Sequence, residues 1–372
     1  MIYADFAATT PLDEDVFEKM KPYFFENYGN ATSVHGFGRS AAQAVEKART
    51  EIAEIINAEK NEIYFTSGGT ESDNWALSGI NAKHIITTEI EHHAILNTCR
   101  ELEKRGTEIT YVPVDKFGFV DPADIKKAIK KETKLISVMT ANNEIGTIEP
   151  IEEIGEIAQK YGICFHTDAV QAAGSIDIDV KKENIGMLSM SAHKFFGPKG
   201  IGVLYKREDV KLRPLTFGGS QERELRPGTL NTPEIVGMAE ALKKQYSEHK
   251  MRSETASLWC KKVKNIVLSK LDNVTINGSE KTRLCGNLNF SFGGLRKESL
   301  LVLLDMNGIA CSAGAACSAG AVTESHVLKA IGASQEAIRI SLSYLTTENE
   351  AEQIGNKIVE CVNSLRKANE LV

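Results

Sequence analysis

The feature that most constrains the fold is an alternation of amphipathic helical segments and short apolar runs between about residues 45 and 210. Residues 41–56 have the spacing of a helix with one apolar face. Six apolar runs of strand length occur along this region, at 62–66, 84–88, 108–112, 134–140, 163–168 and 187–191. Strands that alternate with helices are typical of a mostly parallel sheet covered on both faces, so the sequence predicts an α/β fold.

A second, smaller α/β unit is predicted to follow a long helix. Residues 232–271 keep helical spacing far beyond the length of an average helix, which suits a connector between two domains. Beyond it we expect strands at 273–277, 287–292, 308–311 and 337–342, and helices at 297–306 and from 347 to the end. The predicted large domain is 13–247, and the small domain combines 1–12 with 248–372. A chain of 372 residues is long enough for two such domains.

The composition excludes several classes of protein. The 44 basic and 50 acidic side chains give a net charge of −6, which argues against nucleic acid or a membrane surface as a partner. No apolar run approaches the roughly 18 residues of a membrane helix, and the first residues do not resemble a signal peptide. Seven cysteines are scattered without a Cys-x-x-Cys pair, so we expect no disulfide framework and no metal site. These features favour a cytoplasmic protein.

Polar residues follow the predicted strands, and the carboxyl ends of parallel strands line the ligand crevice of an open α/β sheet. After the strand at 62–66, Gly69 and Thr70 lie in a glycine-rich turn before a helix, which favours a phosphate site at the helix N-terminus. A turn of this kind also begins many helices that bind nothing. Asn142 and Asn143 follow the strand at 134–140, where asparagines are also common simply as turn residues.

Two further strands end in residues of opposite charge. Asp168 ends the strand at 163–168, where a buried carboxylate needs a hydrogen bond or a positive partner such as a protonated ring nitrogen. His166 faces the same side of that strand, and we expect it to support the aspartate. Lys194 follows the strand at 187–191 and precedes two phenylalanines. Partial desolvation would lower its pKa and free the amine for Schiff-base chemistry, whereas an isolated lysine would extend to solvent.

A phosphate site, an aspartate for a pyridine nitrogen and a Schiff-base lysine on one sheet together describe a pyridoxal phosphate enzyme. Over essentially its whole length, the chain resembles the cysteine desulfurases of the NifS/IscS type. These belong to the class V aminotransferase group of the fold-type I pyridoxal-phosphate-dependent transferases. The matching segments are 5–11, 29–30, 35, 38–39, 66–72, 91–92, 142–146, 168–171, 191–194, 226–229, Cys317 and Arg339.

The resemblance implies a role for each residue near the cofactor ring. Lys194 would form the Schiff base with pyridoxal phosphate, Asp168 would pair with the pyridine nitrogen, and His92 would stack on the ring. Lys194, with the help of His92, would also move protons during catalysis. Gln171 and Asn143 would contact the side of the ring that carries the oxygen, and Asn143 would also contact the substrate.

The resemblance also implies how the phosphate and the substrate are held. The residues of the chain that would bind the phosphate are Gly69, Thr70, Ser191 and His193. A threonine from the partner subunit, here Thr229, would join them, so a homodimer is implied. Arg339 would bind the carboxylate of the substrate, a task that suits the two-pronged guanidinium group.

Cys317 matches the cysteine that attacks the substrate sulfur in this family. Leaving sulfur as a transferable persulfide needs a thiolate that reaches the substrate and then carries the sulfur away. Residues 311–320 are nearly all small, which suits a mobile loop. The alternative for a lone cysteine is that it packs as a small buried hydrophobic residue.

Cys311 lies six residues before Cys317, and it has two alternative roles. A short loop rich in glycine and alanine would let Cys311 receive the persulfide or form a regulatory disulfide with Cys317. We favour the other reading, in which 308–311 is a buried strand and the Cys311 thiol is unreactive.

The implied reaction converts L-cysteine to L-alanine with a persulfide on Cys317. The sulfur would pass to an acceptor protein, such as an iron–sulfur scaffold or a tRNA-thiolating enzyme. One alternative on the same scaffold is a selenocysteine lyase or β-lyase. Another is a cofactor-binding protein that mainly scaffolds a sulfur-transfer complex, although the presence of Lys194, Asp168 and Cys317 argues against it.

Overall fold

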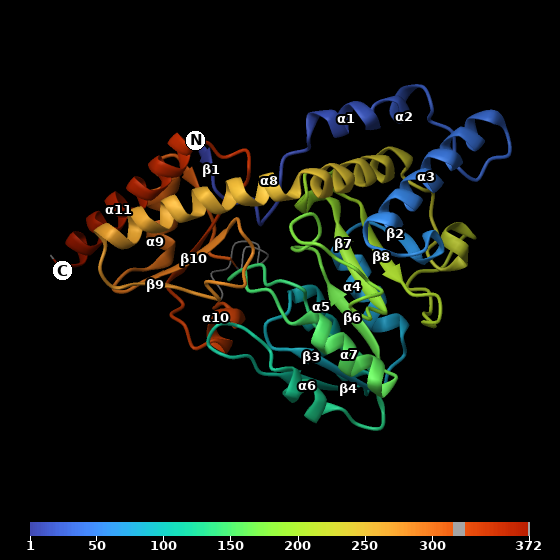
Figure 1. Ribbon diagram of the computed structural model, residues 1–372, viewed down its shortest axis with the longest axis horizontal. Coiled ribbons are helices and arrows are strands. Elements are labelled where there is room, and N and C mark those ends of the chain that lie inside the picture. Colours follow the sequence, from blue (N-terminus) through green and yellow to red (C-terminus); the bar gives the residue numbers. More distant parts are fainter. Residues whose placement is uncertain (315–323, 371–372) are drawn as a thin grey trace.

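The computed structural model describes residues 1–314 and 324–370. Figure 1 shows a sheet with helices packed around it and, beside it, a second unit that contains both ends of the chain. The long helix α8 (Thr232–Lys270) runs from one unit to the other. Its position agrees with the predicted connector helix at 232–271.

A seven-stranded sheet forms the first unit. In spatial order its strands are β2 (Ile63–Thr66), β8 (Gly202–Lys206), β7 (Met187–Ser191), β6 (Cys164–Asp168), β5 (Thr133–Ser137), β3 (His84–Thr88) and β4 (Glu108–Val112). Strand β8 is antiparallel to both of its neighbours, and the other pairs are parallel. Gly202 of β8 pairs with both Thr66 and Ser191. The carboxyl ends of β2 and β7 therefore lie at the same edge of the sheet.

In the described part of the chain, seven α-helices accompany this sheet in addition to α8. They are α1 (Glu14–Met20), α2 (Pro22–Phe25), α3 (Gly36–Ile55), α4 (Gly69–Gly79), α5 (His93–Lys104), α6 (Pro122–Ala128) and α7 (Ile151–Tyr161). Local sequence explains several of their starts. Asp13 and Asp121 accept hydrogen bonds from backbone N–H groups in the first turns of α1 and α6, and Pro122 is at the first position of α6.

Each face of the sheet has its own apolar core, because successive strand residues point to opposite faces. Phe65 and Ile136 pack in one core with residues of α1, α3, α6, α7 and α8. Their neighbours Tyr64 and Leu135 pack in the other core with residues of α4 and α5. Burial on both faces explains why the strands read as continuous apolar runs in the sequence.

The second unit contains a parallel pair, β1 (Ile2–Tyr3) and β11 (Ile309–Ala310), and a three-stranded antiparallel sheet. The order of that sheet is β12 (Ala337–Ser341), β10 (Asn287–Phe292) and β9 (Val274–Ile276). Its helices are α9 (Lys297–Met306), α10 (His326–Ala330) and α11 (Glu348–Glu370). Helix α8 contributes Met238 and Leu242 to the core beneath the large sheet, and Val263 and Val267 to the core of the second unit.

The fold class and most of the expected elements are confirmed. The runs at 84–88, 108–112 and 187–191 are strands with those bounds, and 297–306 is a helix. Strand β8 was not among the expected strands. The segment expected at 308–311 is shorter than predicted, because only Ile309 and Ala310 pair with β1.

Candidate active site

Several strands of the seven-stranded sheet end at one cavity, which has a volume of about 360 Å³. It lies outside the carboxyl ends of β2, β5, β6 and β7, where ligands bind in open α/β sheets. Ten of the residues expected to have a function line it, namely Gly69, Thr70, His92, Asn143, Asp168, Gln171, Ser191, His193, Lys194 and Arg339. The fold thus brings together residues from both units of the structure.

Lys194 is held by the N-terminal segment of the chain. Its Nζ donates hydrogen bonds to the carbonyl oxygens of Ala7, at 2.7 Å, and Ala8, at 2.8 Å. Thr10 anchors this segment, because its hydroxyl donates to the carbonyl oxygen of His193 at 3.0 Å. The amide of Gln171 also donates to Ala7 O, at 2.9 Å. These carbonyl oxygens accept hydrogens of the Lys194 amine and fix Nζ at this wall of the cavity.

Asp168 is a buried carboxylate at the end of β6. It is 5% exposed, and its Oδ1 accepts a hydrogen bond from Val170 N at 2.9 Å. Burial raises its pKa to about 6, although the Val170 hydrogen bond and the charge of Lys194 oppose this effect. A protonated ring nitrogen in the cavity would supply the positive partner that a buried carboxylate needs.

His166 supports this region through two serines rather than through Asp168. Its Nδ1 is 2.9 Å from the Ser137 hydroxyl, and its Nε2 is 3.0 Å from the Ser189 hydroxyl. Oδ1 of Asp73 lies 3.8 Å from Nε2 of His166. Complete burial lowers the pKa of His166 to about 3, so the ring is neutral. Its contacts fit the structural role expected for it.

His92 and His193 both present neutral rings to the cavity. His92 precedes α5, and its Nδ1 accepts a hydrogen bond from Ala94 N at 3.1 Å, which fixes the ring. The Nδ1 of His193 is 3.1 Å from the hydroxyl of Thr9. Burial, together with the positive charge of Lys194, lowers the pKa of each histidine to about 4.

The turn before α4 has the geometry of an anion site. A Cβ at Gly69 would lie 2.6 Å from Cγ2 of Val170, so only glycine fits there. This close approach leaves the N-terminus of the 11-residue helix α4 facing the cavity, beside Ser191. Glu71 holds the turn, since its carboxylate accepts from Ser67 N at 2.7 Å and pairs with Arg226 at 2.9 Å. The arrangement suits a phosphate group.

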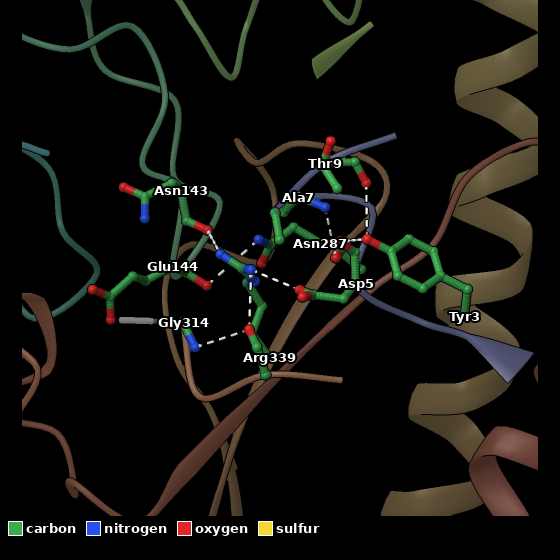
Figure 2. Close-up of polar contacts among 12 residues, drawn as sticks. Tyr3, Asp5, Ala7, Thr9, Asn143, Glu144, Asn287, Gly314 and Arg339 are labelled. Carbon is green, nitrogen blue, oxygen red and sulfur yellow. Dashed lines mark hydrogen bonds and ion pairs between the residues drawn. The ribbon is translucent and has the colours of Figure 1, made fainter. Parts of the chain in front are cut away.

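Arg339 is the buried cation of the cavity wall, and Figure 2 shows its contacts. It lies in β12 and is 2% exposed. Its Nη1 donates to Asn143 O at 2.8 Å, and its Nη2 contacts Asp5 Oδ1 at 2.7 Å and Ser312 Oγ at 3.0 Å. The Nε atom of Arg339 has no hydrogen-bond partner in the described part of the chain. The guanidinium group is therefore fixed at the cavity, and its Nε donor is unpaired among the described residues.

Two expected residues do not lie in the described cavity. Cys317 lies outside the described residues, although Gly314, three positions earlier, lines the cavity. Thr229 is exposed and does not line its own chain's cavity. Cys311 is half-buried against the core of the second unit, and burial raises its pKa to about 12.

Sequence reasoning missed several residues of the cavity. Asp73 lines it, is 1% exposed, and its Oδ1 has no hydrogen-bond partner in the described structure. Met139 and Val170 also line the cavity. Asp5 was noted only as part of a matching segment, and its contact with Arg339 was not expected. The available signal for Asp73 was its position, since it is an acidic residue in the first turns of a helix that follows a glycine-rich turn.

Among the described residues, no three side chains of His, Cys, Asp or Glu are grouped so as to hold a metal ion. The described helices also include none that is long and apolar enough to span a membrane.

The chain matches the Aminotransferase class-V family over residues 2–354. It is 46% identical to a protein named cysteine desulfurase IscS from Dictyoglomus turgidum, over 98% of this chain and 95% of the relative. A protein of the same name from Methanosarcina thermophila is 47% identical over 100% of this chain and 94% of the relative.

Solved structures give the same result. One titled NifS-like protein is 38% identical, with a TM-score of 0.92, and the match covers 98% of this chain and 100% of that chain. Another, titled SspA in complex with cysteine, is 36% identical, with a TM-score of 0.83. That match covers 93% of this chain and 100% of the other chain. This chain therefore belongs to the class V aminotransferase family.

Proposed function

We propose that this protein is a pyridoxal-phosphate-dependent cysteine desulfurase. It converts L-cysteine to L-alanine and retains the sulfur as a persulfide on Cys317. The observation that carries the proposal is the placement of Lys194, Asp168 and Arg339 around one cavity. The names of relatives that share nearly half of its residues support the same activity.

The cavity fits pyridoxal phosphate. The turn at Gly69 and Thr70, with Ser191 and His193, would hold the phosphate, and Asp168 would hold the pyridine nitrogen. The bound cofactor would supply an electron sink for bonds at the α-carbon of the substrate. His92, Asn143 and Gln171 would fix the ring in the remaining directions.

The protein residues would then act in sequence on the substrate. Arg339 would bind the carboxylate of L-cysteine. Nζ of Lys194 would move protons at the α-carbon, with neutral His92 beside it. The thiolate of Cys317 would attack the substrate sulfur, so that a sulfur–sulfur bond forms as the carbon–sulfur bond breaks. The resulting persulfide would pass to an acceptor protein.

A homodimer is part of this proposal. Thr229 is exposed and lies outside the cavity of its own chain, which suits a contact with the phosphate site of a second copy. We also propose the division into domains 13–247 and 1–12 with 248–372. The acceptor is an iron–sulfur scaffold or a tRNA-thiolating enzyme, and the cytoplasm is the expected location.

The experiment that tests the proposal measures alanine release from the cofactor-loaded protein. L-Cysteine, L-selenocysteine and L-cystine are compared, with and without a thiol acceptor. The proposal expects alanine from L-cysteine, and a rate that rises with the acceptor, since the acceptor removes the persulfide. Turnover of selenocysteine or cystine alone would instead show a selenocysteine lyase or a β-lyase. Cofactor binding without turnover would show the scaffolding protein.

A further inference from the structure

Asp5 contacts the same guanidinium group that is proposed to bind the substrate carboxylate. Nη2 of Arg339 donates to Oδ1 of Asp5 at 2.7 Å and to Oγ of Ser312 at 3.0 Å. Since Nη2 carries two hydrogens, these two acceptors use both of them. Nη1 donates to the carbonyl oxygen of Asn143 at 2.8 Å, on the other side of the group (Figure 2).

This arrangement limits how Arg339 can bind a second carboxylate. The two-pronged mode needs two parallel N–H groups, which come either from Nη1 and Nη2 or from Nε and Nη2. Both modes use Nη2. The Nε atom is also buried, so the pair formed by Nη1 and Nη2 is the one that a ligand would use. An incoming carboxylate can therefore bind in this mode only if Asp5 or Ser312 gives up its hydrogen bond to Nη2.

Asp5 is the acceptor that is better placed to leave. Its side chain is 18% exposed, whereas Ser312 is buried and its hydroxyl also accepts a hydrogen bond from Gly314 N at 3.2 Å. Asp5 is also an anion, and it would repel a second carboxylate at the same guanidinium group. Ser312 is neutral and would not.

The backbone of the N-terminal segment is held independently of the Asp5 side chain. Oγ of Ser341 accepts from Ala7 N at 2.9 Å, and Ser341 N donates to the carbonyl oxygen of Ala4 at 2.8 Å. These bonds join the segment to β12 on both sides of Asp5. The Asp5 side chain can therefore rotate away from Nη2 while the carbonyl oxygen of Ala7, which holds Lys194, remains in place.

We propose that Asp5 is a specificity-determining residue, which binds Arg339 in the absence of substrate and is displaced by the substrate carboxylate. The proposal rests on the proposed function, in which Arg339 binds the carboxylate of L-cysteine. Among the described residues, Asp5 is the only carboxylate within 4 Å of this guanidinium group. The exchange keeps a negative charge on Arg339 throughout. A ligand without a carboxylate cannot make the exchange, so it leaves Asp5 in place.

The first test measures the binding of L-alanine to the cofactor-loaded protein through the absorbance of the cofactor. L-Alanine has the amine and carboxylate of the substrate but no sulfur, and L-alaninamide has an amide in place of the carboxylate. Asp5→Asn keeps an acceptor for Nη2 but removes the competing charge. We therefore expect Asp5→Asn to bind L-alanine about fivefold or more tightly than the wild type does, and L-alaninamide equally.

Asp209→Asn is the matched control. Asp209 also pairs with an arginine, Arg207, at 2.6 Å, but its side chain is 67% exposed and it does not line the active-site cavity. This variant should bind L-alanine as the wild type does. If Asp5 were only a structural counter-ion, its replacement would leave L-alanine binding unchanged or weaken it. Equal or weaker binding by Asp5→Asn would therefore overturn the proposal.

The second test needs no variant, so it remains decisive if Asp5→Asn fails to fold. A crystal structure of the cofactor-loaded wild type with L-alanine should show the ligand carboxylate on Nη1 and Nη2 of Arg339, with Asp5 moved away from Nη2. With L-alaninamide, Asp5 should stay on Nη2. An Asp5 carboxylate still bonded to Nη2 beside bound L-alanine would overturn the proposal.

These outcomes separate the proposal from the desulfurase activity on which it rests. A protein that binds L-alanine in exchange for Asp5 but releases no alanine from L-cysteine would contradict the proposed function alone. A protein that desulfurates L-cysteine with Asp5 still on Arg339 would contradict only the role proposed for Asp5.

Discussion

Asp5 and Arg339 form a 2.7 Å ion pair at the active-site cavity although they lie 334 positions apart in the sequence. The pair joins the N-terminal segment to β12, and the Asn143 carbonyl completes the contact from the large sheet. Tyr3 braces the segment, because its hydroxyl donates to the carbonyls of Asp5 and Thr9 (Figure 2). The proposed substrate-binding arginine is thus held by two parts of the chain that are distant from β12, the N-terminal segment and Asn143.

Replacing Arg339 with lysine should weaken substrate binding more than it slows turnover. Lysine keeps the charge but cannot make the paired hydrogen bonds of a guanidinium, so KM for L-cysteine should rise at least about tenfold. Steady-state kinetics would measure this, with Arg296→Lys as the control because the Arg296 side chain is 80% exposed. An unchanged KM in a folded, cofactor-loaded Arg339→Lys protein would contradict the role proposed for Arg339.

Replacing Lys194 with alanine should remove the covalent attachment of the cofactor, because only an imine to this lysine would couple the aldehyde to the chain. Borohydride reduction followed by mass spectrometry should find the adduct on Lys194 in the wild type and none in Lys194→Ala. Exposed Lys199 offers a control, and Lys199→Ala should retain the adduct. An adduct that persists in Lys194→Ala would show that another amine binds the cofactor.

The free energy of unfolding should decrease as the pH falls below 6.5, in part because of His166. Its pKa is about 3 in the folded protein and about 6.5 when unfolded, so the unfolded state binds more protons between these values. The contribution of His166 to stability is therefore present above pH 6.5 and is lost as the pH falls toward 3. The pKa values of Asp168 and Glu91 are raised, so these two carboxyl groups change the stability in the opposite direction as the pH falls. Their effect should be the same in the wild type and in a variant that lacks His166.

Urea unfolding at pH 7, 6 and 5 would isolate this effect by comparison with His166→Asn. Below pH 6.5 the wild type should lose up to about 1.4 kcal/mol per pH unit more than the variant. Parallel stability curves for the two proteins would mean that His166 is not held neutral in the folded state.

Replacing Cys311 with alanine should leave persulfide formation and sulfur transfer within about twofold of the wild type, a change of about 0.4 kcal/mol in the barrier. The reason is that Cys311 packs against an apolar core and burial raises its pKa to about 12. Labelled-sulfur transfer assays would measure both steps. A tenfold loss of transfer, or a Cys311–Cys317 disulfide after mild oxidation, would favour the relay or the switch.

The sheet, and the position of Asp168 and Lys194 at strand ends, could be predicted because both depend on local patterns, whereas the roles of residues such as His92, His193 and Arg339 were implied only by the family resemblance. Asp168 and Lys194 follow strands whose apolar runs are readable, and parallel strands bring their carboxyl ends to one edge. The Asp5–Arg339 pair was not predictable in this way, because it depends on where two distant segments are packed. Nor did the sequence locate the carbonyls of Ala7 and Ala8 near Lys194, since backbone groups leave no residue-type signal.

A smaller cavity beside Lys194, with Arg252 and Cys285 among its lining residues, shows the same limit. Arg252 and Cys285 lie in a helix and a loop that have no motif in common, and only the fold places them in one wall. Thr229 differs again, because the role expected for it concerns a second copy of the chain. Local sequence predicts elements and strand ends, whereas contacts between units and between subunits require the folded chain.

Mass spectrometry of Cys317, after the cofactor-loaded protein reacts with L-cysteine, shows whether this residue carries the sulfur. We expect one additional sulfur atom on Cys317 and an equal amount of L-alanine. Cys317→Ser should bind the cofactor and L-cysteine but form no persulfide, because a hydroxyl is far less acidic than a thiol whose unperturbed pKa is about 8.5. Equal persulfide labelling of the wild type and Cys317→Ser would contradict the role proposed for Cys317.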